Sequence, residues 1–129
     1  MKKNHFFSLS LFAGILLVAF LANPVYAQTP QKTATTSIPK DVYAVFKNSC
    51  MVCHGTGGGQ LTLSVLNFSK WDQYKTAQKA KKAAAICVMI TKGVMPPQSF
   101  QKANPMTVLT TAQKELICNW SRTVISAKK

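Results

Sequence analysis

Cys50-Met51-Val52-Cys53-His54 places two thiols and one imidazole within five consecutive residues. This Cys-x-x-Cys-His spacing is typical of a c-type haem attachment site, where both thiols add to the haem vinyl groups and the histidine reaches the iron. A zinc half-site would need a second Cys/His pair at matching spacing, and a thioredoxin-like redox pair would need a neighbouring βαβ pattern. The sequence offers neither. It therefore predicts one covalently bound haem c, held by Cys50, Cys53 and His54.

Residues 1–27 have the pattern of a secretory signal peptide. A basic start at Lys2 and Lys3 precedes an apolar run, and small residues lie around Ala27. We expect cleavage after Ala27 and a periplasmic or otherwise exported location in a bacterium. The apolar run is nearly long enough to cross a bilayer, so an uncleaved signal that tethers the protein to the membrane stays open as the alternative.

The rest of the chain reads as one linker and one small domain. Residues 28–39 are rich in Thr, Gln, Ala and Pro without apolar periodicity, which predicts a flexible linker. Residues 40–129 are enough for a single mono-haem domain.

The chain is strongly basic, with 16 Lys and Arg against 3 Asp and Glu. Such a balance is common in nucleic-acid-binding proteins, but the expected export and the lack of a nucleic-acid motif argue against that partner. An acidic redox protein, a membrane-bound electron-transfer complex or an anionic membrane surface fits the charge better. The alternative is that the lysines form only a solvated face.

Three helical segments and no convincing strand predict an all-α fold. Val42, Val45 and Phe46 recur at helical spacing after Lys40. The longest helix is expected over 70–91, with Ser69 as its N-cap and Gly93 after its end. A last helix is expected from Thr110, where Thr110 and Gln113 form a capping-box pattern.

The predicted buried stripe of the longest helix contains apolar and small side chains, whereas its lysines are expected to be exposed. The stripe is Trp71, Tyr74, Ala77 or Gln78, Ala85, Val88 and Met89.

The chain resembles a small class I c-type cytochrome, and more narrowly the bacterial haem-binding domain family. Phe46 stands four residues before Cys50, as an aromatic does in many class I cytochromes, and Leu66-Asn67-Phe68-Ser69-Lys70-Trp71 is similar to a segment of the bacterial family. Gly93-Val94-Met95-Pro96-Pro97 resembles the loop that supplies the distal methionine. The segment from Leu109 to Trp120 resembles the closing helix. The resemblance implies a cytochrome c-like domain of three to four helices wrapped around one haem.

The resemblance also implies Met95 as the sixth ligand of the iron. His5 leaves with the signal peptide, so His54 is the only histidine of the mature chain, and bis-histidine ligation within one chain is excluded. Met106 is the rival ligand, and a lysine or an open position remains an alternative. Met51 lies on the proximal side, and Met89 is expected in the helical core. Two prolines after Met95 stiffen its backbone.

Two positions depart from the class I pattern. Many members have a proline about a dozen residues after the haem histidine, and its carbonyl accepts the imidazole N–H. No proline occurs here between His54 and Pro96, which leaves the acceptor unidentified. Many members also have a glycine where this chain has Val42, so we expect a wider or rotated crossing of the first and last helices.

Cys87 and Cys118 are an even pair of remaining thiols in a chain expected to be exported. We expect them to form a disulfide between the long helix and the last helix. Two buried free thiols are the alternative.

Two functions remain open at this point. The first is a non-enzymatic carrier of single electrons between exported redox partners, with the iron held by His54 and Met95. The chain has no acid/base pair or nucleophile for catalysis and only three carboxylates. The second is a haem-based sensor or peroxidase-like protein with an open or displaceable sixth ligand.

Overall fold

The computed structural model describes residues 35–128, which form six α-helices and two short 3₁₀ helices without a strand. The all-α prediction is confirmed. The predicted signal peptide lies outside the described residues, as does most of the predicted linker. In order, the elements are α1 (Lys40–Ser49), α2 (Met51–His54), α3 (Gln60–Val65), η1 (Phe68–Gln73), α4 (Thr76–Thr91), α5 (Gln98–Ala103), η2 (Pro105–Thr107) and α6 (Thr111–Ser126).

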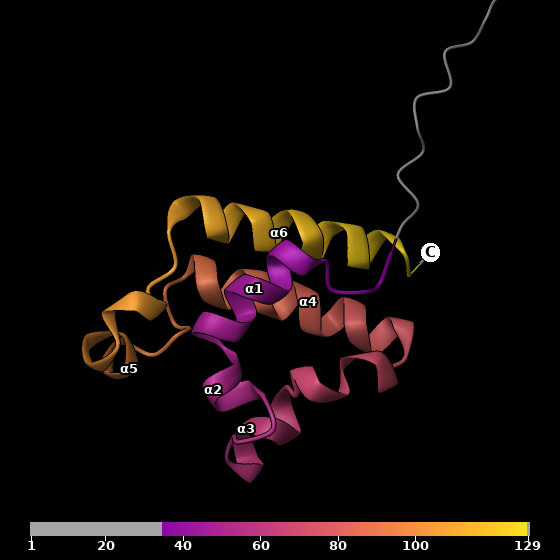
Figure 1. Ribbon diagram of the computed structural model, residues 1–129. Helices are drawn as coiled ribbons and strands as arrows, with labels where there is room; N and C mark the ends of the chain where they lie inside the picture. Colours follow the sequence, from indigo (N-terminus) through magenta and orange to yellow (C-terminus); the bar gives the residue numbers. More distant parts are fainter. Residues whose placement is uncertain (1–34, 129) are drawn as a thin grey trace, which may run out of the picture. The chain divides into compact units, whose positions relative to one another are not determined.

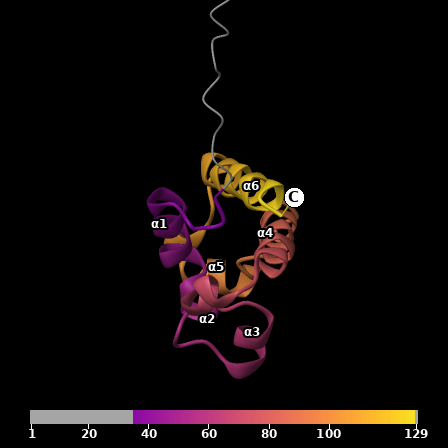
Figure 2. The same ribbon diagram turned by 90° about the vertical axis from the view of Figure 1, so that its right-hand side faces the viewer.

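The long helices α4 and α6 run antiparallel along each other, and α1 packs across α6 from the other side (Figures 1 and 2). Phe46 of α1 meets Trp120 of α6 edge to face, with ring centroids 5.4 Å apart. Val42 of α1 is also buried in the core, and the wider or rotated crossing expected from this residue stays a prediction. The three helices enclose an apolar core that also receives Phe68 and Trp71 of η1.

The starts of α1 and α6 agree with the sequence prediction. The α1 helix begins at Lys40, and Val42, Val45 and Phe46 are buried. At the start of α6, Thr110 Oγ1 accepts a hydrogen bond from the Gln113 amide, and Gln113 Oε1 accepts one from the Thr110 amide. This reciprocal pair satisfies two amides that a helix start otherwise leaves unbonded.

The predicted helix over 70–91 is wrong over residues 70–75. The chain forms η1, breaks at Tyr74 in an extended conformation and begins α4 only at Thr76. The side chain that caps η1 is Asn67, whose Oδ1 accepts from the Ser69 amide, so Ser69 is not the N-cap.

The break also changes which face of the long helix is buried. The buried face of α4 comprises Lys79, Ala80, Ala83, Ile86 and Ile90. Ala77, Gln78, Ala85, Val88 and Met89 are exposed, contrary to the predicted stripe, whereas Trp71 is buried in η1. The burial of Lys79 corrects its predicted exposure, and its ammonium lies 3.8 Å from the carboxylate of Asp72.

The linker predicted over residues 28–39 includes residues that belong to the folded domain. The indole N–H of Trp71 donates to the carbonyl of Thr36 at 2.8 Å, and that of Trp120 donates to the carbonyl of Ser37 at 2.9 Å. Ile38 packs against the core. Residues 36–39 are therefore part of the folded domain.

Cys87 of α4 and Cys118 of α6 form a disulfide, the pairing expected from the sequence. The bond links the two longest helices across 31 residues of sequence. Cross-links of this length stabilise a domain chiefly because they restrict the unfolded chain.

We expect the double substitution Cys87→Ala and Cys118→Ala to lower the free energy of unfolding by about 2–4 kcal/mol. Urea denaturation monitored by far-UV circular dichroism measures this loss. A reductant should destabilise the wild-type protein by a similar amount and leave the variant unchanged. Equal stability of the two proteins without reductant would contradict the prediction.

Within residues 35–128, none of the helices has both the length and the apolar character needed to cross a membrane.

Candidate haem site

The Cys-x-x-Cys-His stretch forms a tight helical turn at the end of α1. The amides of Cys53 and His54 both donate to the carbonyl of Cys50, at 3.2 and 2.9 Å. Residues four apart on a helix share one face, so this turn brings the side chains of Cys50 and His54 to the same side. Both side chains line one cavity, whereas Cys53 is exposed and is not among the lining residues.

Gly58 allows the following loop to fold back on this turn. A Cβ atom at Gly58 would lie 1.9 Å from the carbonyl oxygen of Cys53 and 2.8 Å from its carbon. Any side chain at this position would therefore displace the backbone of the attachment turn. The glycine-rich loop thus closes against the motif.

The imidazole of His54 is oriented by a backbone carbonyl. Its Nδ1 lies 3.1 Å from the carbonyl oxygen of Leu66, twelve residues further along the chain. A carbonyl can only accept a hydrogen bond, so Nδ1 carries the proton, and in the neutral imidazole the lone pair lies on Nε2. This is the arrangement of a metal-binding histidine whose second nitrogen is fixed by an outer partner. Leu66 therefore supplies the acceptor that the sequence left unidentified.

An aromatic cluster behind the imidazole connects the site to the core. Phe68 meets the His54 ring edge to face at 6.4 Å and stacks on Phe46 at 4.4 Å. Trp71 lies 6.4 Å from Phe68 and 5.3 Å from Trp120. Aromatic pairs at these separations add stability beyond the area that they bury.

The cavity beside His54 has a volume of about 200 Å³ and a predominantly apolar wall. Helix α4 supplies one side, and the segment between α3 and η1 supplies the other. The lining residues outside the attachment turn are Val65, Leu66, Phe68, Lys82, Ala85, Ile86, Met89, Ile90 and Met95. An apolar cleft with few convergent polar groups is typical of cofactor sites.

The four methionines that follow Cys50 in the sequence lie in different surroundings. Met95 lines the cavity, as does Met89, which is 42% exposed rather than buried in the core as expected. Met106 is 85% exposed and is not among the lining residues. Its backbone carbonyl accepts a hydrogen bond from the side chain of Asn48 at 2.8 Å. Met51 is half-buried and packs against the core.

The segment that carries Met95 begins at the end of α4. Gly93 has a φ of 69°, a left-handed conformation that glycine adopts without a steric penalty. The amides of Val94 and Met95 then donate to the carbonyl of Met89, at 3.0 and 3.3 Å. These bonds turn the chain back, so Met95 faces the same cavity as Met89.

The two thiols of the motif lie in different environments. Burial raises the pKa of the Cys50 thiol to about 12, and the neighbouring Cys53 thiol contributes to the rise. A raised pKa favours the neutral form, so Cys50 is protonated at neutral pH as long as its thiol is free. Conversion to a thioether would remove this ionisable group from the cavity wall.

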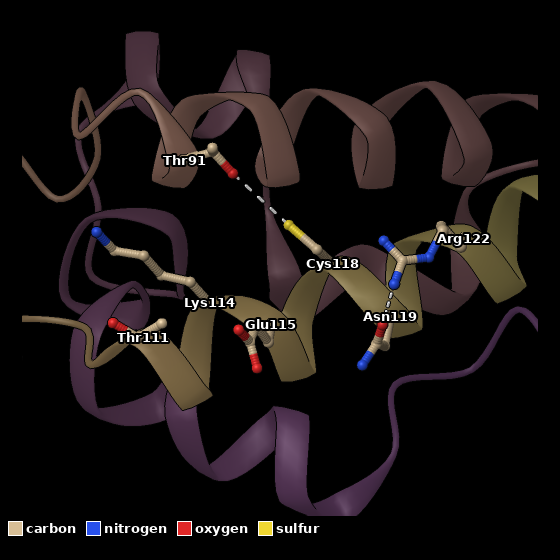
Figure 3. A pocket seen from close by; sticks show the side chains of 7 residues that line it. All are labelled: Thr91, Thr111, Lys114, Glu115, Cys118, Asn119 and Arg122. Carbon is tan, nitrogen blue, oxygen red and sulfur yellow. Dashed lines mark hydrogen bonds between the residues drawn. The ribbon is translucent and has the colours of Figure 1, made fainter.

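A second hollow of about 510 Å³ lies beside the disulfide and has a different character. Figure 3 shows its polar lining along α6, with Lys114, Glu115, Asn119 and Arg122, and with Thr91 Oγ1 3.8 Å from Cys118 Sγ. None of its lining residues contributes to the cavity beside His54.

The lining of the cavity beside His54 fits a haem. Haem is a large apolar disc whose iron binds imidazole nitrogen and thioether sulfur. The cavity combines an oriented imidazole and two thioethers with aliphatic and aromatic walls, and Cys50 lies at its edge. These features are typical of the haem-binding site of a haem protein.

Residues 60–123 match the sequence model of the haem-binding domain. Over this span, the chain is similar to the haem-binding domain family, which confirms the resemblance to that family found in the sequence. The match begins after Gly59 and so does not include the Cys50–His54 motif. No curated protein and no solved structure shows significant similarity to the chain.

Three contributors to this site are not identified by the sequence. Leu66 acts through its backbone, so its side chain carries no signal. Met89 was assigned to the core because the helix was given the wrong phase. Lys82 was grouped with the exposed lysines but is half-buried in the cavity wall.

Proposed function

We propose that the protein is an exported mono-haem c-type cytochrome that transfers single electrons between redox partners and is not an enzyme. The observation that carries this proposal is the orientation of His54, whose Nδ1 bonds to Leu66 while the ring faces a cavity shared with Met95. An iron bound by both histidine and methionine is typical of electron-transfer cytochromes c.

In this proposal each residue has a separate task. Cys50 and Cys53 would hold the haem through two thioether bonds. His54 would bind the iron through Nε2, with the imidazole oriented by the Leu66 carbonyl, and Met95 would supply a sulfur ligand. The haem would contribute a metal that gains and loses one electron without bond making or breaking. The apolar wall formed by Ile86 and Ile90 excludes water from the site.

Met95 is favoured over the other methionines by its position. It lines the cavity from outside a helix, beside two prolines that restrict its backbone. Met106 lies outside the lining, and Met89 is fixed within α4. A methionine ligand raises the reduction potential of the iron, because its soft thioether sulfur favours the reduced metal.

Carbon monoxide binding to the ferrous protein tests the carrier against the open-site alternative. If the iron is six-coordinate and its methionine is firmly held, adding carbon monoxide at neutral pH should leave the ferrous spectrum unchanged. Ready formation of a carbon monoxide adduct, together with a high-spin ferric spectrum, would instead establish a sensor or peroxidase-like protein.

The basic surface is proposed to steer the protein to an acidic redox protein or a membrane-bound electron-transfer complex. Residues 35–128 contain eleven lysines and one arginine but three side-chain carboxylates. Electrostatic attraction between the basic surface and an acidic partner weakens as salt screens the charges. The rate of electron exchange with the partner should therefore fall as ionic strength rises.

A further inference from the structure

Lys82 is a charged residue in the wall of a largely apolar cavity. It belongs to α4 and lines the cavity together with His54, Met89 and Met95. Its ammonium group donates a hydrogen bond to the carbonyl of Val65 and lies 4.6 Å from the ring centroid of Tyr74. The carbonyl and the aromatic face together hold the side chain over the segment between α3 and η1.

Lys82 and Tyr74 hold this segment on both sides of Leu66. Lys82 bonds to the carbonyl of Val65, and Tyr74 Oη accepts a hydrogen bond from the amide of Asn67 at 3.1 Å. Leu66, between them, accepts the bond from His54. The ammonium group is thus anchored one peptide unit from the carbonyl that orients the imidazole.

Among the residues that the structure describes, no carboxylate pairs with the charge of Lys82. The single ion pair found within residues 35–128 joins Lys79 to Asp72. Glu115 lies at the polar hollow on α6, and Asp41 accepts a hydrogen bond at the start of α1. A neutral carbonyl and an aromatic face stabilise an ammonium group without cancelling its charge. The cavity wall therefore carries a net positive charge.

We propose that Lys82 is a positioning residue that would raise the reduction potential of a haem iron held by His54. This inference rests on the proposed function, since it requires haem bound at His54. Loss of one electron adds a positive charge at the iron, and a nearby ammonium group disfavours that change. The same charge draws electron density from the Leu66 carbonyl, which makes His54 a weaker donor to the ferric iron.

Redox titration of purified haem-loaded protein, with Lys82→Met compared with the wild type, tests this role. The midpoint potential should fall, and the ratio of ferrous to ferric protein at a fixed applied potential should decrease by about threefold or more. Lys81→Met is the matched control, because Lys81 lies next along α4 but is exposed and is not among the cavity-lining residues. Lys82→Arg retains the charge and should keep the wild-type potential.

Lys82→Gln provides a second test, because it removes the charge but keeps a hydrogen-bond donor. The same fall in potential is expected, so the test stands even if Lys82→Met does not fold. A midpoint equal to that of Lys81→Met, in a variant with covalent haem and a low-spin spectrum, would overturn the role of Lys82 alone. Absence of covalent haem from the wild-type protein would overturn the proposed function instead.

Discussion

Replacing Cys50 and Cys53 together with alanine is expected to remove all haem from the denatured polypeptide. Non-covalent contacts in the cavity disappear when the chain unfolds, whereas thioether bonds persist. The wild-type protein should therefore keep its haem on a denaturing gel, detected by haem-dependent peroxidase staining. The double variant should show no stain, even when the same amount of protein is loaded.

The matched control is the pair Cys87→Ala and Cys118→Ala. These residues form the disulfide between α4 and α6 and do not line the cavity beside His54. This variant should be less stable but should retain full haem staining. Stain that persists in the Cys50 and Cys53 double variant would contradict covalent attachment at these thiols.

Replacing Met95 with alanine is expected to abolish the iron(III)–thioether charge-transfer band of the oxidised spectrum. The substitution removes the sulfur from the cavity wall and leaves the iron with a weaker sixth ligand or none. The reduction potential should also fall, because the thioether favours the ferrous state. Optical spectroscopy and redox titration of the same sample measure both effects.

Two further methionine variants are the controls for this prediction. Met106→Ala should retain the band, because Met106 is not among the cavity-lining residues. Met89→Ala should also retain it, although the lost side chain lines the cavity and changes its packing. Loss of the band in Met89→Ala but not in Met95→Ala would assign the sixth ligand to α4.

Local patterns in the sequence were sufficient for the helical turn at Cys50–His54 and for two of the three long helices. The motif is contained within five residues, and its turn is closed by local backbone bonds from the amides of Cys53 and His54 to the carbonyl of Cys50. The start of α6 is similarly local, since Thr110 and Gln113 cap each other. Such features depend little on the rest of the fold and can be predicted without it.

The phase of α4 depends on a break that local patterns do not show. Trp71 and Tyr74 have the spacing of a helical stripe, but Trp71 is held by its bond to Thr36, 35 residues earlier. Trp120 likewise bonds to Ser37, 83 residues earlier. Contacts across such distances decide where the linker ends and where α4 begins, and neither is visible in a short window of sequence.

Only the spacing of about a dozen residues pointed to the partner of His54, because the bond uses the backbone and the Leu66 side chain carries no signal. Any residue can offer a carbonyl, and the expected proline is absent. Leu66 has a φ of −149°, far from the value near −65° that a proline ring imposes, and its amide donates to the carbonyl of Thr62. The local backbone therefore differs from that of a proline-bearing loop but delivers a carbonyl to the same ring.

The most direct test of the account is a high-resolution crystal structure of the exported, haem-loaded protein. We expect a single haem joined to Cys50 and Cys53, with the iron bound by His54 Nε2 and by the sulfur of Met95. His54 Nδ1 should remain within hydrogen-bond distance of the Leu66 carbonyl, as it is here at 3.1 Å. An iron that binds another side chain in place of His54, or a His54 ring turned away from Leu66, would contradict the central claim.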